Sequence, residues 1–161
     1  MDTKTKTKTT PKRPKRKAQQ LQLKSLRYLN MKAAQQPKLG IASIELTEAY
    51  TRIDFHYTAP DYYVNGGWIQ MEPRAFIRPV GTNTTYTLVK TINIKLNPSK
   101  TYFKHCGQRH TFTLFFPALP EGTEAIDIIE KEAPGTYFNF YNIRFSSWLK
   151  LNIPKSTFIN S

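Results

Sequence analysis

Cysteine, histidine and acidic residues are scarce in this chain of 161 residues, which has one Cys, three His and 11 Asp plus Glu. One cysteine forms no internal disulfide, and a zinc site needs about three or four ligands gathered in space. No apolar run is longer than Leu114–Phe116, whereas a membrane-spanning helix needs roughly 18 residues. We therefore expect no disulfide framework, no metal or other cofactor and no membrane span. The expected location is the cytoplasm, or a virion if the protein is a viral component.

Basic residues are abundant and unevenly placed. The chain has 24 Lys plus Arg and a net charge of +13. Residues 1–38 contain twelve basic residues and one acid, which gives +11, and residues 39–161 contain the other twelve with ten acids, which gives +2. The basic character therefore belongs to the N-terminal quarter, and the rest of the chain is close to neutral.

Residues 1–17 are predicted to form a disordered basic arm, because they have almost no apolar side chains to offset the entropy of ordering. Residues 11–17 place five positive charges among two prolines, which favour an extended chain whose side chains reach separate phosphates. Such clusters also act as nuclear import signals, polybasic membrane-surface segments or solubilising tails. The predicted nucleic-acid-binding residues are Lys4, Lys6, Lys8, Lys12, Arg13, Lys15, Arg16, Lys17, Lys24 and Arg27.

Residues 18–38 are predicted to form a short helix and linker. Residues 18–36 are rich in Ala, Gln, Leu, Lys and Arg, lack Gly and Pro, and are followed by Pro37 and Gly40, which are helix stop signals. The apolar residues of this segment do not fall on one clean stripe at the helical period. Packing of the helix against the body is therefore a weaker inference than helicity.

From Leu39 onward the apolar residues alternate with a period of two, which is typical of half-buried strands. Gly and Pro turns follow every ten residues or so, and the long crossover segments of a parallel sheet are missing. We predict an all-β fold, an antiparallel Ig-like or jelly-roll-type β-sandwich over residues 39–161, preceded by the arm and the helix. The expected strands are Ile41–Leu46, Thr51–Thr58, Trp68–Met71, Ala75–Val80, Tyr86–Leu96, Thr111–Phe116, Glu124–Glu130 and Thr136–Phe145.

Two of these segments make detailed predictions. In Tyr86–Leu96 the parity assigns Ile92 and Ile94 to the core, and Lys90 is expected to be a lysine of a sheet edge that discourages edge pairing. In Thr136–Phe145 the apolar parity slips by one residue, which predicts a bulge or a strand covered on both faces.

Residues 111–123 read TFTLFFPALPEGT, and residues 125–130 read AIDIIE. This order resembles a β-sandwich domain of unknown function that is common in Bacteroidota proteins, in which a Phe-Pro-x-Leu-Pro-x-Gly-Thr turn leads into an Ile-Asp-x-Ile-Glu strand. Residues 44–47 and 51–57 fit the first hairpin of such domains, so the resemblance covers roughly residues 41–145. It implies the fold and a cell-envelope location, but no catalytic residues. This chain has a basic extension in place of an export signal.

Two groups of residues could carry chemistry in the body. His105, Cys106 and His110 are the one cluster of nucleophile and metal-ligand types, but ordinary loop residues are the favoured interpretation, since no further partner has ligand spacing. Five aromatic residues in or beside loops could stack on bases or sugars near Arg74 and Lys104, although packing in the core and at sheet edges is the favoured interpretation for them. These five are Tyr62, Tyr63, Trp68, Tyr102 and Phe103.

The sequence thus favours a non-enzymatic structural or assembly protein. Its basic N-terminal region, residues 1–38, is expected to bind nucleic acid or another polyanion without sequence specificity. The sandwich is expected to bind a protein partner or to self-associate, as in a virion or nucleoprotein component. The alternative is a cell-envelope or ligand-binding accessory module. An enzyme built on the His105, Cys106 and His110 loop ranks last.

Overall fold

The computed structural model describes residues 19–26 and 39–145. Within these residues the chain is all-β, its sheets are antiparallel, and no helix is present, so none that could span a membrane. The strands are β1 (Gln19–Leu26), β2 (Leu39–Leu46), β3 (Tyr50–Thr58), β4 (Trp68–Ile69), β5 (Phe76–Pro79), β6 (Tyr86–Thr87), β7 (Lys90–Ile92), β8 (Thr101–Tyr102), β9 (Arg109–Pro117), β10 (Ala125–Ile129) and β11 (Phe140–Arg144).

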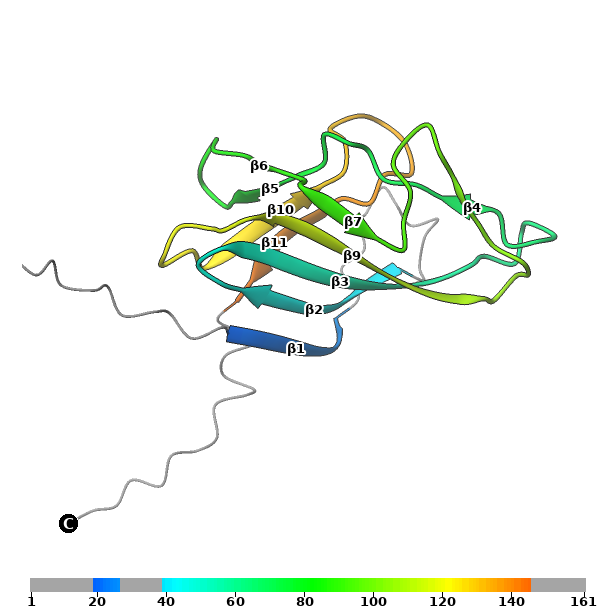
Figure 1. The fold of residues 1–161 in the computed structure, drawn as a ribbon, viewed down its shortest axis with the longest axis horizontal. Coiled ribbons are helices and arrows are strands. Elements are labelled where there is room, and N and C mark those ends of the chain that lie inside the picture. Colours follow the sequence, from blue (N-terminus) through cyan, green and yellow to red (C-terminus); the bar gives the residue numbers. More distant parts are fainter. Residues whose placement is uncertain (1–18, 27–38, 146–161) are drawn as a thin grey trace, which may run out of the picture.

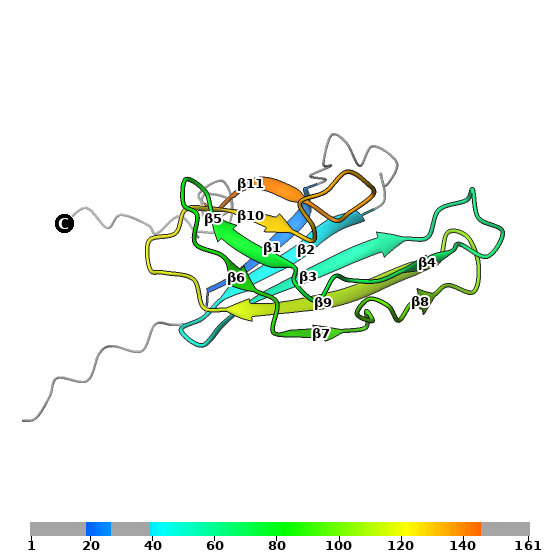
Figure 2. The same ribbon diagram turned by 90° about the horizontal axis from the view of Figure 1, so that it is seen from above.

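The strands form three sheets (Figure 1). A five-stranded sheet has the order β1-β2-β3-β9-β7, a four-stranded sheet has the order β11-β10-β5-β6, and β4 pairs with β8 alone. The view from above shows the four-stranded sheet lying over the five-stranded one, with β4 and β8 at the far end of β9 (Figure 2). The larger sheets therefore form two layers, and the small ladder extends beyond them.

The two layers share one hydrophobic core. In β3 the residues Ile53, Phe55 and Tyr57 are buried and alternate with partly exposed neighbours, which confirms the parity predicted for this strand. The Phe55 ring lies 5.8 Å from the ring of Phe140 on β11 and stacks on Phe112 of β9 at 4.9 Å. Aromatic side chains thus link β3 and β9 to the opposite layer.

The helix expected over residues 18–36 is wrong for Gln19–Leu26, which forms β1 and pairs antiparallel with β2. Helix propensity is a weak preference that pairing with a free sheet edge can override. The segment also alternates Gln and Leu at residues 20–23, a period-two pattern that the helical composition obscures. The rest of the predicted helix and linker lies outside the described residues.

The single strand expected over Tyr86–Leu96 is also wrong, because the chain changes sheets within it. The Leu88 amide donates to Ala75 O at 2.7 Å, and the next amide, of Val89, donates to Phe115 O at 2.8 Å. Successive amides of an extended chain point in opposite directions, so this segment pairs first with the four-stranded sheet and then with the five-stranded one. Ile94 is buried as predicted, but Ile92 is 39% exposed.

Two predictions about strand edges and bulges are confirmed. Lys90 lies in β7, the edge strand of the five-stranded sheet. Between β10 and β11, Ile126 pairs with Ile143 and Ile128 pairs with Phe140, so β11 contains one extra residue. This bulge lets both Phe140 and Ile143 point into the core although they are three residues apart.

Candidate nucleic-acid interface

Most of the predicted nucleic-acid-binding residues belong to the arm. Lys24 lies in β1. The remaining nine lie outside the described residues, namely Lys4, Lys6, Lys8, Lys12, Arg13, Lys15, Arg16, Lys17 and Arg27. Any polyanion-binding surface among the described residues other than Lys24 therefore belongs to the body, residues 39–145.

The β4–β8 ladder has one buried face and one exposed aromatic face. Trp68 pairs with Tyr102, and Ile69 pairs with Thr101. Directly opposed residues of an antiparallel pair project to the same side of the ladder, so Trp68 and Tyr102 lie next to each other. Trp68 is 43% exposed and Tyr102 is 68% exposed, whereas Ile69 is buried. The ladder thus presents two large rings to solvent.

A lysine completes this surface. The ammonium nitrogen of Lys100 lies 4.1 Å from the centroid of the Trp68 ring, within the range of a cation–π contact. We call Trp68, Tyr102 and Lys100 the β4–β8 platform. Two further exposed rings, of Tyr62 and Tyr63, lie in the preceding loop with centroids 4.7 Å apart.

Backbone hydrogen bonds fix the two segments that carry the platform. The Phe103 amide donates to Gly67 O at 3.0 Å, and the Gly107 amide donates to Ala59 O at 2.9 Å. Gly66 has a φ of +79°, and a Cβ added to it would lie 2.6 Å from His105 O, so only glycine fits this close approach. The platform is therefore held by main chain on both sides.

The core supports the platform from below. The buried Phe103 ring, next to Tyr102 in sequence, stacks on Tyr57 with centroids 5.4 Å apart. Burial raises the pKa of Tyr57 to about 12, and charge repulsion from the phenolates of Tyr62 and Tyr63 adds to this rise. The aromatic surface is thus continuous with the aromatic core, which limits its movement.

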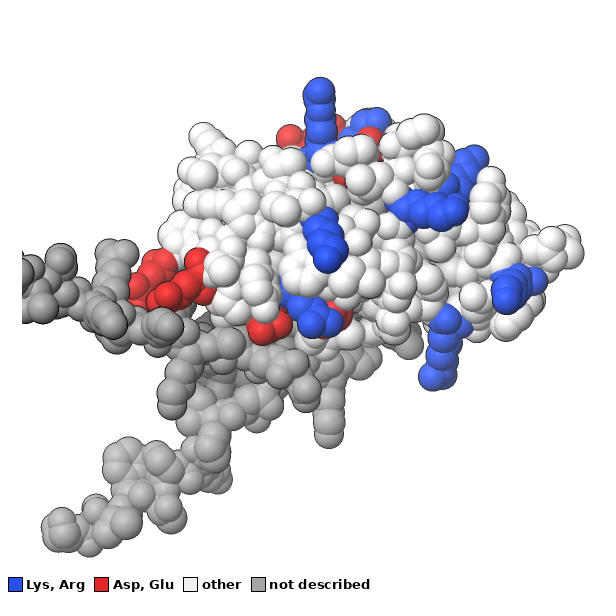
Figure 3. Space-filling view, viewed as in Figure 1, with Lys and Arg blue, Asp and Glu red and all other residues white. Residues whose placement is uncertain are grey.

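The end of the molecule that holds the platform is basic. Residues 59–69 and 95–110 contain four basic residues and one acid, Asp61. The basic residues are Lys95, Lys100, Lys104 and Arg109. In the space-filling view, Lys and Arg but no Asp or Glu are visible over the right-hand end of the face, where β4 lies (Figure 3). A polyanion is the ligand that this charge distribution favours.

The five loop aromatics divide between the core and the surface. Phe103 is a core residue, but Tyr62, Tyr63, Trp68 and Tyr102 are all exposed. Strands of two residues, such as β4 and β8, are too short to show a period, so parity could not separate Trp68 from Ile69 in advance. The cross-strand register shows that Trp68 lies on the exposed face of the ladder and Ile69 on the buried face.

The side chains of the Cys106 loop do not converge. His105 Nδ1 lies 2.9 Å from the neighbouring Cys106 carbonyl oxygen, while His110 Nε2 contacts Asn93 O and its ring packs against Phe103 and Phe112. Cys106 is an exposed free thiol. Among residues 19–26 and 39–145, no group of three or more His, Cys, Asp or Glu side chains is placed to hold a metal ion.

Sequence reasoning missed a buried carboxyl group, Glu130. It is 7% exposed and lines the same small core cavity as Phe112 and Phe138. The Phe138 amide donates to Glu130 Oε2 at 2.7 Å, and the Glu130 amide donates to Asn139 Oδ1 at 2.9 Å. Burial raises the pKa of Glu130 to about 7, and the Glu72 carboxylate adds to the rise, against hydrogen bonds from the Phe138 and Glu72 backbone.

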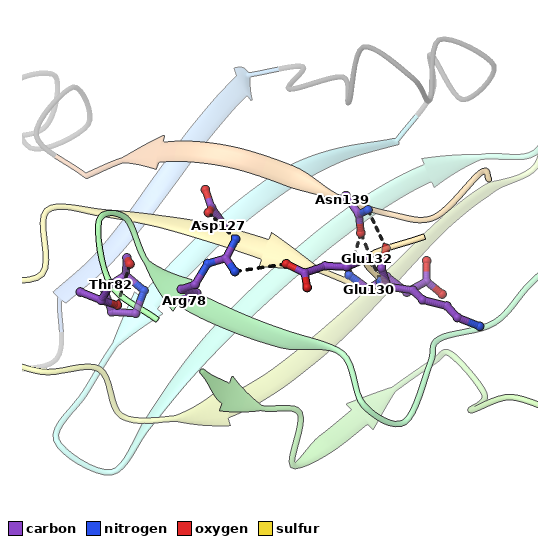
Figure 4. A network of polar contacts seen from close by, with 8 residues as sticks. Arg78, Thr82, Asp127, Glu130, Glu132 and Asn139 are labelled. Carbon is purple, nitrogen blue, oxygen red and sulfur yellow. Dashed lines mark hydrogen bonds and ion pairs between the residues drawn. The ribbon is translucent and has the colours of Figure 1, made fainter. Parts of the chain in front are cut away.

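A partly buried ion-pair network lies near Glu130 (Figure 4). Arg78 bridges Asp127 and Glu132, with both nitrogen–oxygen distances at 3.1 Å. Asp127 also accepts the Asn142 amide of the bulge at 2.9 Å. These groups are paired with one another and with the backbone of a strand bulge, so they stabilise the sheet.

A polar cleft of about 480 Å³ lies at the end of the two-layered body opposite the platform, between the β5–β6 and β9–β10 connections (Figure 1). Threonine, glutamate, asparagine and arginine side chains line it together with turn residues. The lining includes Thr82, Thr84, Tyr86, Glu121, Thr123, Glu124, Asn142 and Arg144.

Comparison of the chain with protein-family models, with curated proteins and with solved structures finds no match.

Proposed function

We propose that this protein is a non-enzymatic assembly or interaction protein that binds nucleic acid, or another polyanion, through residues 1–38 and without sequence specificity. The observation that carries the proposal is the charge distribution, +11 before Leu39 and +2 after it. Twelve basic residues within 38 supply the phosphate-neutralising groups, and the nearly neutral body does not repel other copies strongly.

The arm acts by releasing counterions. Each lysine or arginine that neutralises a phosphate frees condensed cations, so affinity falls with salt at a log–log slope of about −0.9 per contact on duplex DNA and about −0.7 on single strands. Lysine and threonine side chains on an extended arm contact the backbone and have no fixed geometry for reading base edges. Binding is therefore strong at low salt and indifferent to sequence.

The body supplies the protein contacts. We assign it to the Ig-like or jelly-roll-type sandwiches, in which two antiparallel layers enclose one core. The two larger sheets have β1, β7, β6 and β11 as their edge strands, and sheet edges can pair with another chain. A virion shell or a nucleoprotein particle is the assembly that such a body with a basic arm would build.

The test is a salt titration of binding to mixed-sequence RNA and DNA by the full chain and by a chain lacking residues 1–17. The deletion removes eight basic residues and one acid, a change of −7. We expect it to abolish most binding and to flatten the salt slope. A full-length control whose arm sequence is shuffled keeps the charge and should bind as the original does.

Two results would contradict the proposal. Unchanged binding after the deletion would move the polyanion site into the body. No binding by the intact chain at low salt would remove the nucleic-acid function and leave the alternative.

The alternative is a ligand-binding accessory module of the cell envelope. One observation favours it: the Pro120–Thr123 turn, which carries much of the resemblance to the Bacteroidota domain, lines the polar cleft. Thermal unfolding with a panel of small saccharides and amino acids tests this function. A ligand that raises the melting temperature of the full chain, but not that of an Arg144→Ala variant, would support it.

A further inference from the structure

We propose that the β4–β8 platform is a second nucleic-acid site, where exposed bases of a single strand stack on Trp68 and Tyr102. This inference rests on the proposed function, since the arm brings the strand to the protein. It adds a distinct site in the body and a preference for single strands, which the arm alone does not give.

The register of the ladder places the two rings for stacking. Trp68 and Tyr102 are cross-strand partners, and Cβ atoms of such pairs lie about 4.5–5.5 Å apart. Neighbouring bases of a strand can therefore meet neighbouring rings. Both rings project from paired backbone whose other face is buried at Ile69, so little conformational entropy is lost when a base binds.

The charges near the rings favour a phosphate backbone. Lys100 lies over the Trp68 ring, and Lys104 follows Tyr102 by two residues. An aromatic surface flanked by lysines combines a stacking contact with a backbone contact, the pairing used by proteins that bind single strands without sequence preference. A neutral sugar would gain nothing from this excess of positive charge.

A duplex does not offer the same contact. Its base faces are stacked on each other inside the helix, so only edges and phosphates are accessible to protein. The arm binds either form through phosphates, whereas the platform requires unstacked bases. Loss of the rings should therefore weaken single-strand binding selectively.

Full-length protein carrying both Trp68→Thr and Tyr102→Thr is the test variant, because threonine suits an exposed strand position. The control is Tyr141→Thr, which removes a ring of similar exposure, 49%, from β11 in the other layer. Melting curves establish that the variants are folded. The ligands are a 15-nucleotide oligothymidine, the corresponding dT·dA duplex, and a neutral glucan oligosaccharide.

We expect the double variant to bind the oligothymidine at least tenfold more weakly, since each base–ring stack contributes roughly a five- to hundredfold factor in affinity. Duplex affinity should change less than twofold, and the control should match the original protein on both. Equal losses on single strand and duplex, or no loss on either, would overturn the platform while leaving the arm in place. Loss of glucan binding alone would reassign the platform to sugars.

Photocrosslinking of the unsubstituted protein to an oligonucleotide containing 5-bromouracil gives a readout that does not depend on the variants folding. Adducts mapped by mass spectrometry to Trp68 or Tyr102 would support the platform. Adducts confined to residues 1–38 would overturn it but would support the arm. The absence of single-strand binding at low salt would overturn both.

Discussion

At the scale of single residues, Glu130 is the side chain whose ionisation the fold opposes most clearly. Its pKa is 4.5 in an unfolded chain and about 7 in the folded protein, because burial disfavours the carboxylate. Between these values the unfolded chain loses its proton first. Raising the pH from about 4.5 to 7 therefore destabilises the folded state, and the full penalty is present above pH 7.

The Glu130→Gln variant should remove this penalty, because an uncharged amide still accepts the Phe138 amide hydrogen. We expect similar stability at pH 5, and at pH 8 a variant more stable by roughly 3 kcal/mol, the equivalent of the rise in pKa from 4.5 to about 7. Urea unfolding of both proteins at the two pH values measures the difference.

The control for this prediction is Glu132→Gln, which removes a carboxylate that is exposed and pairs with Arg78. Its effect on stability should be the same at pH 5 and pH 8. A Glu130→Gln variant that is equally destabilised at both pH values would show that the buried carboxyl is ionised in the folded protein.

The sequence could predict which residues of β3 are buried but could not predict the burial of Glu130. The parity of Ile53, Phe55 and Tyr57 is a local property that a period of two reveals. Glu130 is covered because Phe138 and Asn139 fold back on it, nine residues or fewer along the chain. That return depends on the turn between β10 and β11, which no periodicity encodes.

At the scale of secondary-structure elements, β1 shows that part of the N-terminal region belongs to the sheet. It pairs with β2 through register positions from Gln19↔Leu46 to Leu26↔Ile41. A chain lacking residues 1–17 should melt at the temperature of the full chain, since those residues have little apolar surface. A chain lacking residues 1–26 should melt roughly 5 °C lower or more, because the β2 edge loses its ladder.

Circular dichroism melts of the three chains at equal concentration check this prediction. If both truncated chains keep the melting temperature of the full chain, β1 contributes nothing to the stability of the sheet. If the shorter truncation already lowers it, the arm has contacts with the body.

The errors at this scale have physical causes. Composition favoured a helix over the residues of β1 because Gln, Lys and Leu are compatible with a helix as well as with a strand. Pairing with the free edge of β2 decides between the two, and a local stretch of sequence does not show that edge. In Tyr86–Leu96 the alternation persists although β6 and β7 belong to different sheets, since an extended chain keeps its period when it crosses between layers. The sequence singled out Trp68 and Tyr102 as possible stacking residues but could not predict that they pair across β4 and β8, because ladders this short carry no period.

At the scale of the whole molecule, the basic charge and the candidate binding surfaces lie in different parts of the protein. The basic arm precedes β1, the aromatic platform lies at one end of the two layers, and the polar cleft lies at the other. With a net charge of +2 over residues 39–161, the bodies of neighbouring copies repel one another weakly. Under the proposed function, this weak repulsion would let copies gathered on one nucleic acid pair through their bodies.

Protein purified from cells without nuclease should consequently carry nucleic acid, with a raised ratio of absorbance at 260 to 280 nm and particles of mixed size. Nuclease treatment at moderate salt should lower the ratio to that of protein alone, because the arm binds phosphates and not buried bases. Light scattering should then show a discrete multiple of 18.7 kDa, held by contacts between sandwiches. The chain lacking residues 1–17 should purify free of nucleic acid in the same oligomer. A monomer after nuclease treatment would show that nucleic acid alone gathers the copies. A low absorbance ratio before treatment would count against the arm as a polyanion site.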